Sequence, residues 1–375
     1  MLRPFLSRYS VPVHQNLLVD TSNAARAVTR GDLNFVICEN CGFIFNQAFD
    51  FSRLSYHKNY DNTQSHSPVF TAYMDEIVDN MIYHKNIKNC NIIEIGCGKG
   101  DFIRKLISHP ASRNVGYGFD PSYIGPLHDI NQRLNFRNCF YDEKCTDIVP
   151  DVVVCRHVIE HIAQPLTILK SVRSALAGSK NAKVFFETPC VEWILKHRVI
   201  WDFFYEHCSL FSAKSLRFAF ERSGFIVDNI EHIFNGQYLW LEATLADDVD
   251  FQTETPTDLI AMSLSYSSQE KNIQDVWYRR LYDLRQFGKI ALWGAGAKGV
   301  TLANLIDPHC ILIDCVVDLN PKKQGCFIPG TGHPIISPLA LSERQISNAV
   351  IMNPNYLEEN QNLINQENIK VNLIC

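Results

Sequence analysis

Two short glycine turns, each between an apolar run and an amphipathic segment, restrict this chain of 375 residues to an α/β architecture. The first lies in the run NIIEIGCGKGDFIRKLI, and the second lies in the run KIALWGAGAKG. A buried parallel strand is a continuous apolar run, and glycines let the backbone turn sharply at the positive end of the following helix. Each turn therefore predicts a strand, a ligand-binding loop and a helix, in that order.

The first turn predicts an adenosyl site. It follows an expected strand over residues 92–95 and carries Gly96, Gly98 and Gly100. This spacing differs from the dinucleotide fingerprint, whose third glycine falls one residue later. The next apolar run ends in Asp120, whose carboxylate can accept hydrogen bonds from both hydroxyls of a ribose. The alternative is an ordinary tight turn with Asp120 as a helix cap, but the order strand, turn, helix, strand, acid favours a ligand.

The pattern of apolar and polar residues divides the chain into four segments. Residues 1–70 are polar and short-period, and residues 71–245 alternate apolar runs with helix-length amphipathic segments. A polar, helical connector is expected over 246–285, and a second α/β alternation fills 286–375. We therefore predict a Rossmann-like core with a small N-terminal domain and a second Rossmann-like domain at the C-terminus, which suits the length.

Composition excludes several classes of partner. With 35 Lys and Arg against 40 Asp and Glu, the net charge is −5 and no basic stripe suggests nucleic acid or an anionic membrane. Hydrophobic residues make up 46%, as in globular proteins, but no apolar stretch is long enough for a membrane span. The 13 cysteines are scattered singly, which is typical of reduced thiols. We expect a cytoplasmic protein.

A third motif invites another interpretation. His157, Glu160 and His161 spell His-x-x-Glu-His, which on a helix can hold the zinc ion of a protease. The motif directly follows an expected buried strand over residues 152–155, downstream of the first glycine turn. That context argues against a protease.

The core resembles class I S-adenosylmethionine-dependent methyltransferases, in the runs EIGCGKGDF, GFDPS and PDVVVCRHVIEHIAQPL. The resemblance implies that the glycine turn and its preceding acid hold the methionyl part, that Asp120 holds the ribose, and that His157 lines the floor near the sulfonium. Residues near Tyr141 are implied at the adenine. The implied cofactor-binding residues are Glu94, Gly96, Cys97, Gly98, Gly100, Asp120, Tyr141, Asp142 and His157.

The second turn has true Gly-x-Gly-x-x-Gly spacing at Gly294, Gly296 and Gly299, and Asp318 ends the next apolar run. Such a turn can seat the pyrophosphate of a dinucleotide or of a nucleotide sugar on a helix N-terminus. From the residues alone, a nucleotide sugar, another nucleotide and an empty turn remain open.

The whole chain resembles the three-part sugar C-methyltransferases of deoxysugar pathways, most specifically in GAGAKGVTLAN and VVDLNPKKQGCFIPGTGHPIISP. The resemblance implies C-methylation of a small acceptor, a nucleotide-linked keto sugar. Its implied binding residues are Gly294, Gly296, Lys298 and Gly299. The alternatives are O- or N-methylation of a sugar or related metabolite, and binding of cofactor or nucleotide sugar without catalysis.

The run DFFYEHCSLFSAKSLRFAFERSGF resembles that family's catalytic stretch, in which a Tyr-His-Glu-His run supplies the base. Here Phe204 and Tyr205 occupy the first two positions, while Glu206 and His207 keep the last two. We expect His207 to act as the base and Glu206 to orient it or to bind a sugar hydroxyl. Tyr205 would donate a hydrogen bond to the developing oxyanion. The changed positions leave the acceptor atom open.

The resemblance also implies a zinc site in the N-terminal domain, built from two Cys-x-x-Cys pairs. Only Cys38 and Cys41 are present here, and two ligands do not close a tetrahedral site. His14 and His57 could complete it, or the segment is an unmetalled remnant; both interpretations remain open.

Overall fold

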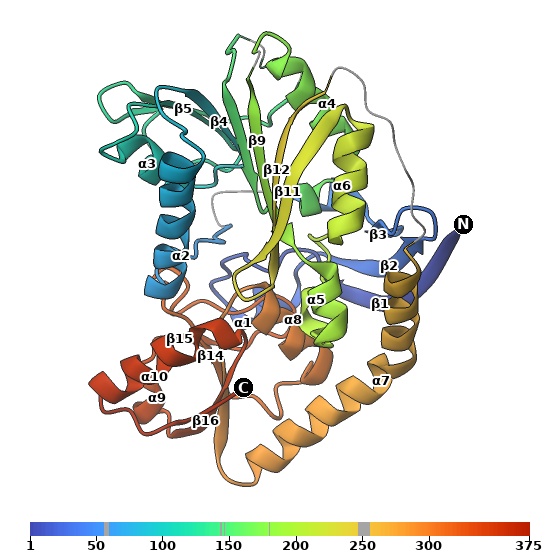
Figure 1. The fold of residues 1–375 in the computed structure, drawn as a ribbon. Helices are drawn as coiled ribbons and strands as arrows, with labels where there is room; N and C mark the ends of the chain where they lie inside the picture. The colour runs from blue at the N-terminus through green and yellow to red at the C-terminus, as the bar shows by residue number, and fades with distance from the viewer. Residues whose placement is uncertain (56–59, 143–144, 146, 180, 247–255) are drawn as a thin grey trace.

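The computed structural model describes residues 1–55, 60–142, 145, 147–179, 181–246 and 256–375. Three β-sheets form the framework, and Figure 1 shows the large central sheet above the C-terminal elements, with the N-terminal strands beside their junction. The predicted α/β class with a Rossmann-like core is confirmed. None of the helices in the described ranges is long and apolar enough to cross a membrane.

The central sheet has eight strands, parallel in the middle and antiparallel at both edges. Their order is β11 (Phe225–Ile233), β12 (Tyr238–Leu245), β9 (Lys183–Pro189), β8 (Val152–Arg156), β4 (Asn91–Ile95), β5 (Val115–Phe119), β7 (Leu134–Arg137) and β6 (His128–Asp129). The chain moves to one side of β4 with β5 and to the other side with β8. In open α/β sheets, ligands bind beyond the carboxyl ends of the strands at such a switch point.

Helices cover this sheet on both faces (Figure 1). They are α2 (Pro68–Asp79), its π-helical continuation η2 (Asn80–His84), α3 (Asp101–Ser108), α4 (Pro165–Leu176) and α6 (Ala213–Arg222). Helix α5 (Val191–Lys196) lies beyond the end of the sheet, where it contacts the long helix α7 (Thr257–Arg285). Helix α3 shows why the sequence folds this way, because its apolar residues, Phe102, Ile103, Leu106 and Ile107, recur on one face and are all buried.

The N-terminal sheet is antiparallel and takes one strand from the core. Its order is β1 (Leu2–Pro12), β2 (Arg30–Cys38), β3 (Ile44–Asn46) and β10 (Ser209–Leu210). Strand β10 begins two residues after His207, so pairing with β3 fixes one end of the predicted catalytic stretch.

The C-terminal part begins with the long helix α7 (Thr257–Arg285) and continues as a parallel five-stranded sheet. The strand order is β15 (Ile335–Ile336), β14 (Cys315–Val317), β13 (Lys289–Trp293), β16 (Ile346–Ile351) and β17 (Asn372–Ile374). The associated helices are α8 (Ala297–Ile306), α9 (Ala340–Glu343) and α10 (Leu357–Gln366). The second glycine turn lies between β13 and α8, as expected for a second Rossmann-like unit.

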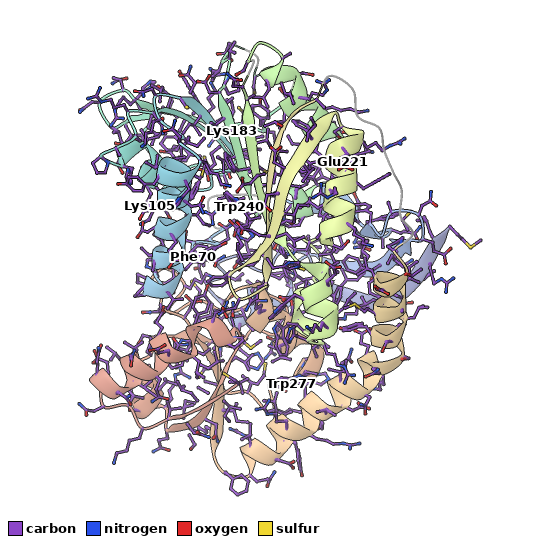
Figure 2. All side chains as sticks on the ribbon, in the orientation of Figure 1. Phe70, Lys105, Lys183, Glu221, Trp240 and Trp277 are labelled. Atoms are coloured by element: carbon purple, nitrogen blue, oxygen red, sulfur yellow. The ribbon has the colours of Figure 1, made fainter. Side chains whose placement is uncertain are left out.

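The three parts share one buried core around the catalytic stretch. Arg8 of β1 donates hydrogen bonds to the Phe203 carbonyl, at 2.9 Å, and to Glu270 of α7, at 2.8 Å. Trp277 of α7, labelled in Figure 2, packs edge-on against Trp201, with 5.1 Å between ring centroids. Because these contacts join elements distant in sequence, the catalytic stretch is held from three sides.

Gly299 offers a test of the packing between β13 and α8. A Cβ added there would lie 2.0 Å from the Gly294 carbonyl oxygen, whereas one at Gly178 would only touch Val149, at 3.5 Å. We expect Gly299→Ala to lower the free energy of unfolding by about 1–3 kcal/mol. Gly178→Ala should stay within about 0.5 kcal/mol. Urea unfolding of both variants measures the difference; equal midpoints would contradict the packing.

Candidate active site

Two cavities meet beside the central sheet. The core cavity, of about 560 Å³, lies at the carboxyl ends of β4, β5 and β8. The junction cavity, of about 300 Å³, lies between the core and the C-terminal sheet. Both are lined by Tyr60, Asn62, Thr63, Gln64, His157 and His161. Molecules bound in the two cavities would therefore face each other across this shared wall.

The first glycine turn lines the core cavity and is tied to β5. The Gly98 N–H donates to Asp120 Oδ2 at 2.8 Å, and Asp120 Oδ1 accepts from the backbone and side chain of Ser122. A carboxylate offers about four lone-pair sites, so Asp120 retains capacity for a ligand hydroxyl. Gly96 has a φ of +68°, and a Cβ there would lie 2.1 Å from a Val158 methyl group, so this position requires glycine.

Gly100 has a different position from the one expected. It caps α3 with a φ of +82°, and a Cβ there would lie 2.6 Å from the Phe136 ring. It is absent from the lining of the core cavity, so its role is in the turn itself. All the other predicted cofactor residues line that cavity: Glu94, Gly96, Cys97, Gly98, Asp120, Tyr141, Asp142 and His157.

The carboxyl group of Glu94 lines this cavity with one oxygen that has no hydrogen-bond partner. Its carboxyl is buried, and Oε2 has no hydrogen-bond partner. Burial raises the pKa of Glu94 to about 8, against the opposing effect of Arg156. An unpaired buried carboxylate oxygen is costly unless a ligand satisfies it. The site therefore fits a ligand that brings a cationic donor.

Farther along the wall, Tyr141 and Asp142 lie beside an aromatic surface. The Tyr141 ring packs edge-on against Phe119, with 5.1 Å between centroids, and its buried hydroxyl has no partner. Burial raises the pKa of Tyr141, so the hydroxyl remains a neutral donor. A flat ring with hydrogen-bonding edges matches this mixture of apolar face and polar atoms.

His157 lies in the shared wall and is held by a buried charge network that the sequence did not reveal. Its Nε2 lies 2.9 Å from Glu187 Oε1 of β9, to which Tyr73 also donates at 2.6 Å. Arg156 donates to the other Glu187 oxygen at 2.5 Å. Burial opposes a charge on His157, but Glu187 and Glu160 together raise its pKa to about 9. His157 is therefore a fixed cation with a strained φ of +53°.

Glu160 and His161 lie in η3 (Ile159–His161), a single 3₁₀ turn. The His-x-x-Glu-His motif is thus not on the continuous helix that a protease zinc site needs, in line with the sequence argument. The ligand atoms of Glu160, His161 and His207 do lie within 4.8 Å of one another. Protonated His157 and Lys298 border the same space, so this cluster fits proton handling better than a divalent cation.

Glu206 and His207 both line the junction cavity. His207 is partly exposed there, with its ring 4.0 Å from that of Phe204. Burial, together with His161, His157 and Lys298, lowers the pKa of His207 well below its ordinary value, so the imidazole is neutral. Glu206 is fully buried, accepts from Gln15 N at 2.8 Å, and has a pKa raised by burial to about 7.

Tyr205 points elsewhere, away from the position that an oxyanion donor needs. Its hydroxyl accepts from the Asp50 N–H at 2.8 Å and donates to the Asp50 carbonyl at 3.3 Å. The ring packs on Phe49 and against Gly31, and it lines neither cavity. Successive residues diverge here because β10 turns the chain into the N-terminal sheet, which puts Tyr205 into that sheet's core.

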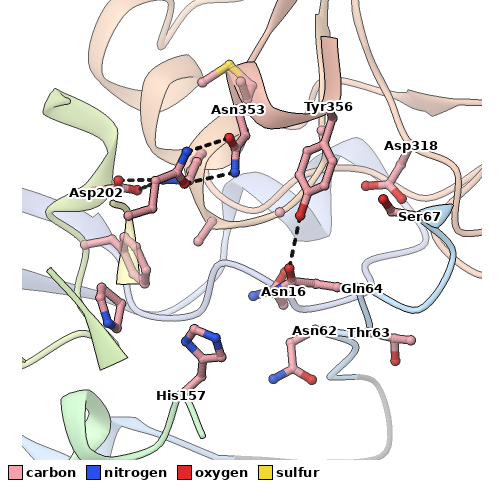
Figure 3. A pocket seen from close by; sticks show the side chains of 18 of the residues that line it. Asn16, Asn62, Thr63, Gln64, Ser67, His157, Asp202, Asp318, Asn353 and Tyr356 are labelled. Atoms are coloured by element: carbon pink, nitrogen blue, oxygen red, sulfur yellow. Dashed lines mark hydrogen bonds and ion pairs between the residues drawn. The ribbon is translucent and has the colours of Figure 1, made fainter. Parts of the chain in front are cut away.

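The second glycine turn forms the opposite side of the junction cavity. Gly294, Gly296 and Lys298 line it, while Gly299 packs against the Gly294 carbonyl and does not. Lys298 Nζ lies 2.5 Å from both carboxylate oxygens of Asp202, so an ion pair connects the turn to the catalytic stretch. Figure 3 shows Asn353, Tyr356 and Asp318 across the cavity from His157.

Some of these wall residues escaped the sequence argument. Gln237 and Asn353 exchange two side-chain hydrogen bonds, at 2.9 and 3.1 Å, across the junction. Arg156 gave the one available signal, since a charged residue ends the otherwise apolar run of β8. The remaining lining residues come from helices, strands and loops that only packing brings together.

The zinc prediction lacks a closed ligand set in the described residues. Cys38 pairs with Leu2 while Arg30 pairs with Pro12, so His14 lies at the far end of the hairpin, about 30 Å from Cys38. His14 instead accepts from the Ser55 N–H at 3.0 Å. His57 lies outside the described residues. Cys38 and Cys41 thus gain no third ligand there, and the residues present do not fit a structural zinc ion.

Comparison with known families agrees with this geometry. A model of a methyltransferase domain matches residues 66–230, and a model of a C-methyltransferase C-terminal domain matches residues 249–370. The chain is a methyltransferase. The methyltransferase carries the C-methyltransferase C-terminal domain after its core. The predicted methyltransferase core and C-terminal domain are thereby confirmed.

The methyltransferase has distant relatives of diverse activity. A tRNA U34 carboxymethyltransferase of Campylobacter fetus is 26% identical over 164 residues, which are 41% of this chain and 57% of the relative. The methyltransferase thus spans little more than half of that relative. Magnesium protoporphyrin IX methyltransferase of Synechocystis is 16% identical, with coverages of 48% and 84% and a TM-score of 0.37. Burkholderia thailandensis 1,6-didemethyltoxoflavin-N1-methyltransferase is 12% identical, and the match covers 48% of this chain and 82% of that one with a TM-score of 0.36.

The position of Tyr205 predicts a purely structural phenotype. Tyr205→Phe removes the partner of the Asp50 N–H, and we expect the free energy of unfolding to fall by about 1 kcal/mol. Binding of S-adenosylmethionine and kcat should stay within about twofold. Thermal unfolding, calorimetric titration and turnover test this together. A large loss of kcat with unchanged stability would show that Tyr205 takes part in the reaction.

Proposed function

We propose that this methyltransferase methylates a carbon atom of a small, nucleotide-linked keto sugar, with the methyl donor in the core cavity and the acceptor in the junction cavity. The observation that carries the proposal is the wall that the two cavities share at His157 and His161. Methyl transfer is an in-line displacement, so it requires the nucleophile and the methyl carbon to be aligned and dry. When bound, S-adenosylmethionine supplies an electrophilic methyl group.

In the core cavity, different residues would bind different parts of the methyl donor. Glu94 would accept from the methionyl ammonium, which explains its unpaired Oε2. Asp120, fixed by the Gly98 N–H, would accept from a ribose hydroxyl. Tyr141 and Asp142 would meet the adenine. His157 would line the floor of this cavity on the side that faces the junction cavity.

In the junction cavity, the second glycine turn would seat the acceptor's diphosphate. Gly294 and Gly296 expose backbone at the start of α8, a ten-residue helix whose N-terminus favours an anion. Lys298 remains on the cavity wall although it is paired with Asp202. Lys323 contributes a second buried ammonium group, with Nζ bound to the Ala295 carbonyl at 3.0 Å. The helix terminus and the two lysines, which pair with Asp202 and Asp318, support a diphosphate at this turn.

His207 would remove the proton from the acceptor carbon. It is neutral, partly exposed in the junction cavity, and close to the shared wall through His161, whose ring lies 4.9 Å away. A C–H beside a ketone becomes nucleophilic only when a base takes its proton while the enolate oxygen is stabilised. Glu206, next to it and buried, would orient the substrate's hydroxyls with Oε1, which has no partner.

Methylation at oxygen or nitrogen is the alternative, and the C-methyltransferase C-terminal domain favours carbon. Deuterium exchange separates the two chemistries. In deuterated water without methyl donor, a carbon-directed enzyme should exchange the proton next to the ketone of a nucleotide-linked keto sugar, as seen by mass spectrometry. Methylation of a hydroxyl without any exchange would overturn the carbon assignment. Calorimetric binding of NAD, with none of S-adenosylmethionine, would overturn the methyl transfer itself.

The pKa of Glu94 predicts how cofactor binding depends on pH. In the free protein Glu94 has a pKa of about 8, and an ammonium partner stabilises its ionised form. Binding should therefore release a proton, and affinity should rise with pH until about pH 8 and then level off. Glu94→Gln should bind S-adenosylmethionine more weakly and lose this slope, whereas Glu192→Gln, outside the core cavity, should keep it. Calorimetry in two buffers of different ionisation enthalpy measures the protons released.

His207 predicts a specific kinetic loss. We expect His207→Ala to reduce kcat by about 10²–10⁴-fold with unchanged binding of S-adenosylmethionine, because only the proton transfer is lost. Tyr205→Phe is the matched control from the neighbouring position. In the native enzyme saturated with S-adenosylmethionine, kcat should stay level from pH 8 down to about pH 6, since the pKa of His207 lies well below its ordinary value. An acid limb near pH 7 would assign the base to Glu206 instead.

A further inference from the structure

Outside both cavities, a cysteine, a histidine and an aspartate form a chain at the end of α8. Cys310 Sγ lies 3.7 Å from His333 Nδ1, and His333 Nε2 lies 3.3 Å from Asp307 Oδ2. None of the three residues lines the core cavity or the junction cavity. A thiol, an imidazole and a carboxylate in this order form the arrangement that activates nucleophilic cysteines.

The carboxylate end of the chain is rigid. Asp307 is buried and accepts backbone hydrogen bonds from Ile311, Leu312 and Ile313 at 2.7–3.0 Å. These donors hold the carboxylate in its ionised form, and with His333 they lower the pKa of Asp307 despite its burial. An ionised Asp307 requires a proton on the facing Nε2 of His333, which is 1% exposed. His333 thus has its orientation fixed.

The thiol end is accessible, and its Sγ lies near His333, Arg26 and the Thr331 carbonyl, the last at 3.4 Å. Cys310 is partly exposed and has a φ of +57°, a strained conformation for a residue with a side chain. Arg26 of α1 (Ser22–Arg26) approaches its Sγ to 3.9 Å. Burial and Asp307 raise the pKa of Cys310, but His333 and Arg26 outweigh them and lower it. Burial lowers the pKa of His333, but Asp307 and Cys310 outweigh it and raise that pKa to about 9.

We propose that Cys310 is a reactive thiolate that hydroperoxides oxidise to the sulfenic acid. The thiolate sulfur attacks one peroxide oxygen, the O–O bond breaks, and a new S–O bond forms. The sulfur is oxidised by two electrons, and the peroxide is reduced to water or an alcohol. The leaving oxygen takes the proton of His333 Nδ1, while Thr331, with Oγ1 2.7 Å from that nitrogen, keeps the imidazole in place.

The surroundings give this oxidation a structural consequence. Arg26 Nε donates to the Thr331 carbonyl at 3.0 Å, and Ser22 Oγ donates to the Gly332 carbonyl at 3.1 Å. Helix α1 of the N-terminal part is therefore docked on the loop that carries His333. A sulfenic acid at Cys310 removes the negative charge that faces Arg26, so oxidation weakens this contact without touching either cavity.

Peptide-resolved alkylation of the full chain tests the proposal. The intact protein is treated with limiting iodoacetamide from pH 6 to pH 9, and each cysteine is followed by mass spectrometry. Cys139 and Cys375 are internal controls, because both are exposed and have raised pKa values. At pH 6.5 Cys310 should react at least several-fold faster than either, with little gain at higher pH, whereas the controls should gain about tenfold per pH unit. If the alkylation rate of Cys310 depends on pH as those of the controls do, Cys310 is not a thiolate and the proposal is wrong.

The peroxide step has its own readout. With hydrogen peroxide and dimedone, the sulfenic acid adduct should form first at Cys310, and its absence there would overturn the oxidation. His333→Gln should reduce both the alkylation advantage and the adduct at least several-fold, with folding checked by binding of S-adenosylmethionine. Asp307→Asn serves as the second variant if His333→Gln fails to fold. A folded variant that retains the full advantage would remove the histidine from the proposal.

Discussion

The buried carboxylate of Glu187 is the interaction on which the active site depends. It accepts hydrogen bonds from Arg156 and Tyr73 and pairs with His157, so it joins α2, β8 and β9 behind the wall that the cavities share. A buried charge is stable only when it is paired, and three partners satisfy this one. The strained His157 backbone is held by the same network, which therefore fixes the floor between the two cavities.

The second requirement is that sheets distant in sequence converge on one short stretch. Phe203 receives a hydrogen bond from Arg8 of β1, Asp202 pairs with Lys298 of α8, and β10 continues the stretch into the N-terminal sheet. The three-part organisation thus has a mechanical role, because each part holds one end or one side of the residues before His207. The C-terminal turn is joined to this stretch by the ion pair between Lys298 and Asp202.

Local patterns predicted the elements whose causes are local. The apolar runs and glycine spacing indicated β4, β13 and both turns, and they led to Glu94 and Asp120 at the carboxyl ends of β4 and β5. Contacts between distant segments leave no such local pattern in the sequence. The sequence does not show that Tyr205 turns into the N-terminal core while its neighbours face the cavity, since that depends on the pairing of β10 with β3. For the same reason it did not reveal Glu187 beneath His157.

The central claim is that donor and acceptor meet across His157 and His161. A crystal structure with S-adenosylhomocysteine and a nucleoside diphosphate bound together tests it most directly. The account predicts the thioether sulfur in the core cavity, directed toward the wall that the two cavities share, and the diphosphate at Gly294 and Gly296 on the opposite side. A diphosphate in the core cavity, or a sulfur directed away from the junction cavity, would contradict the account.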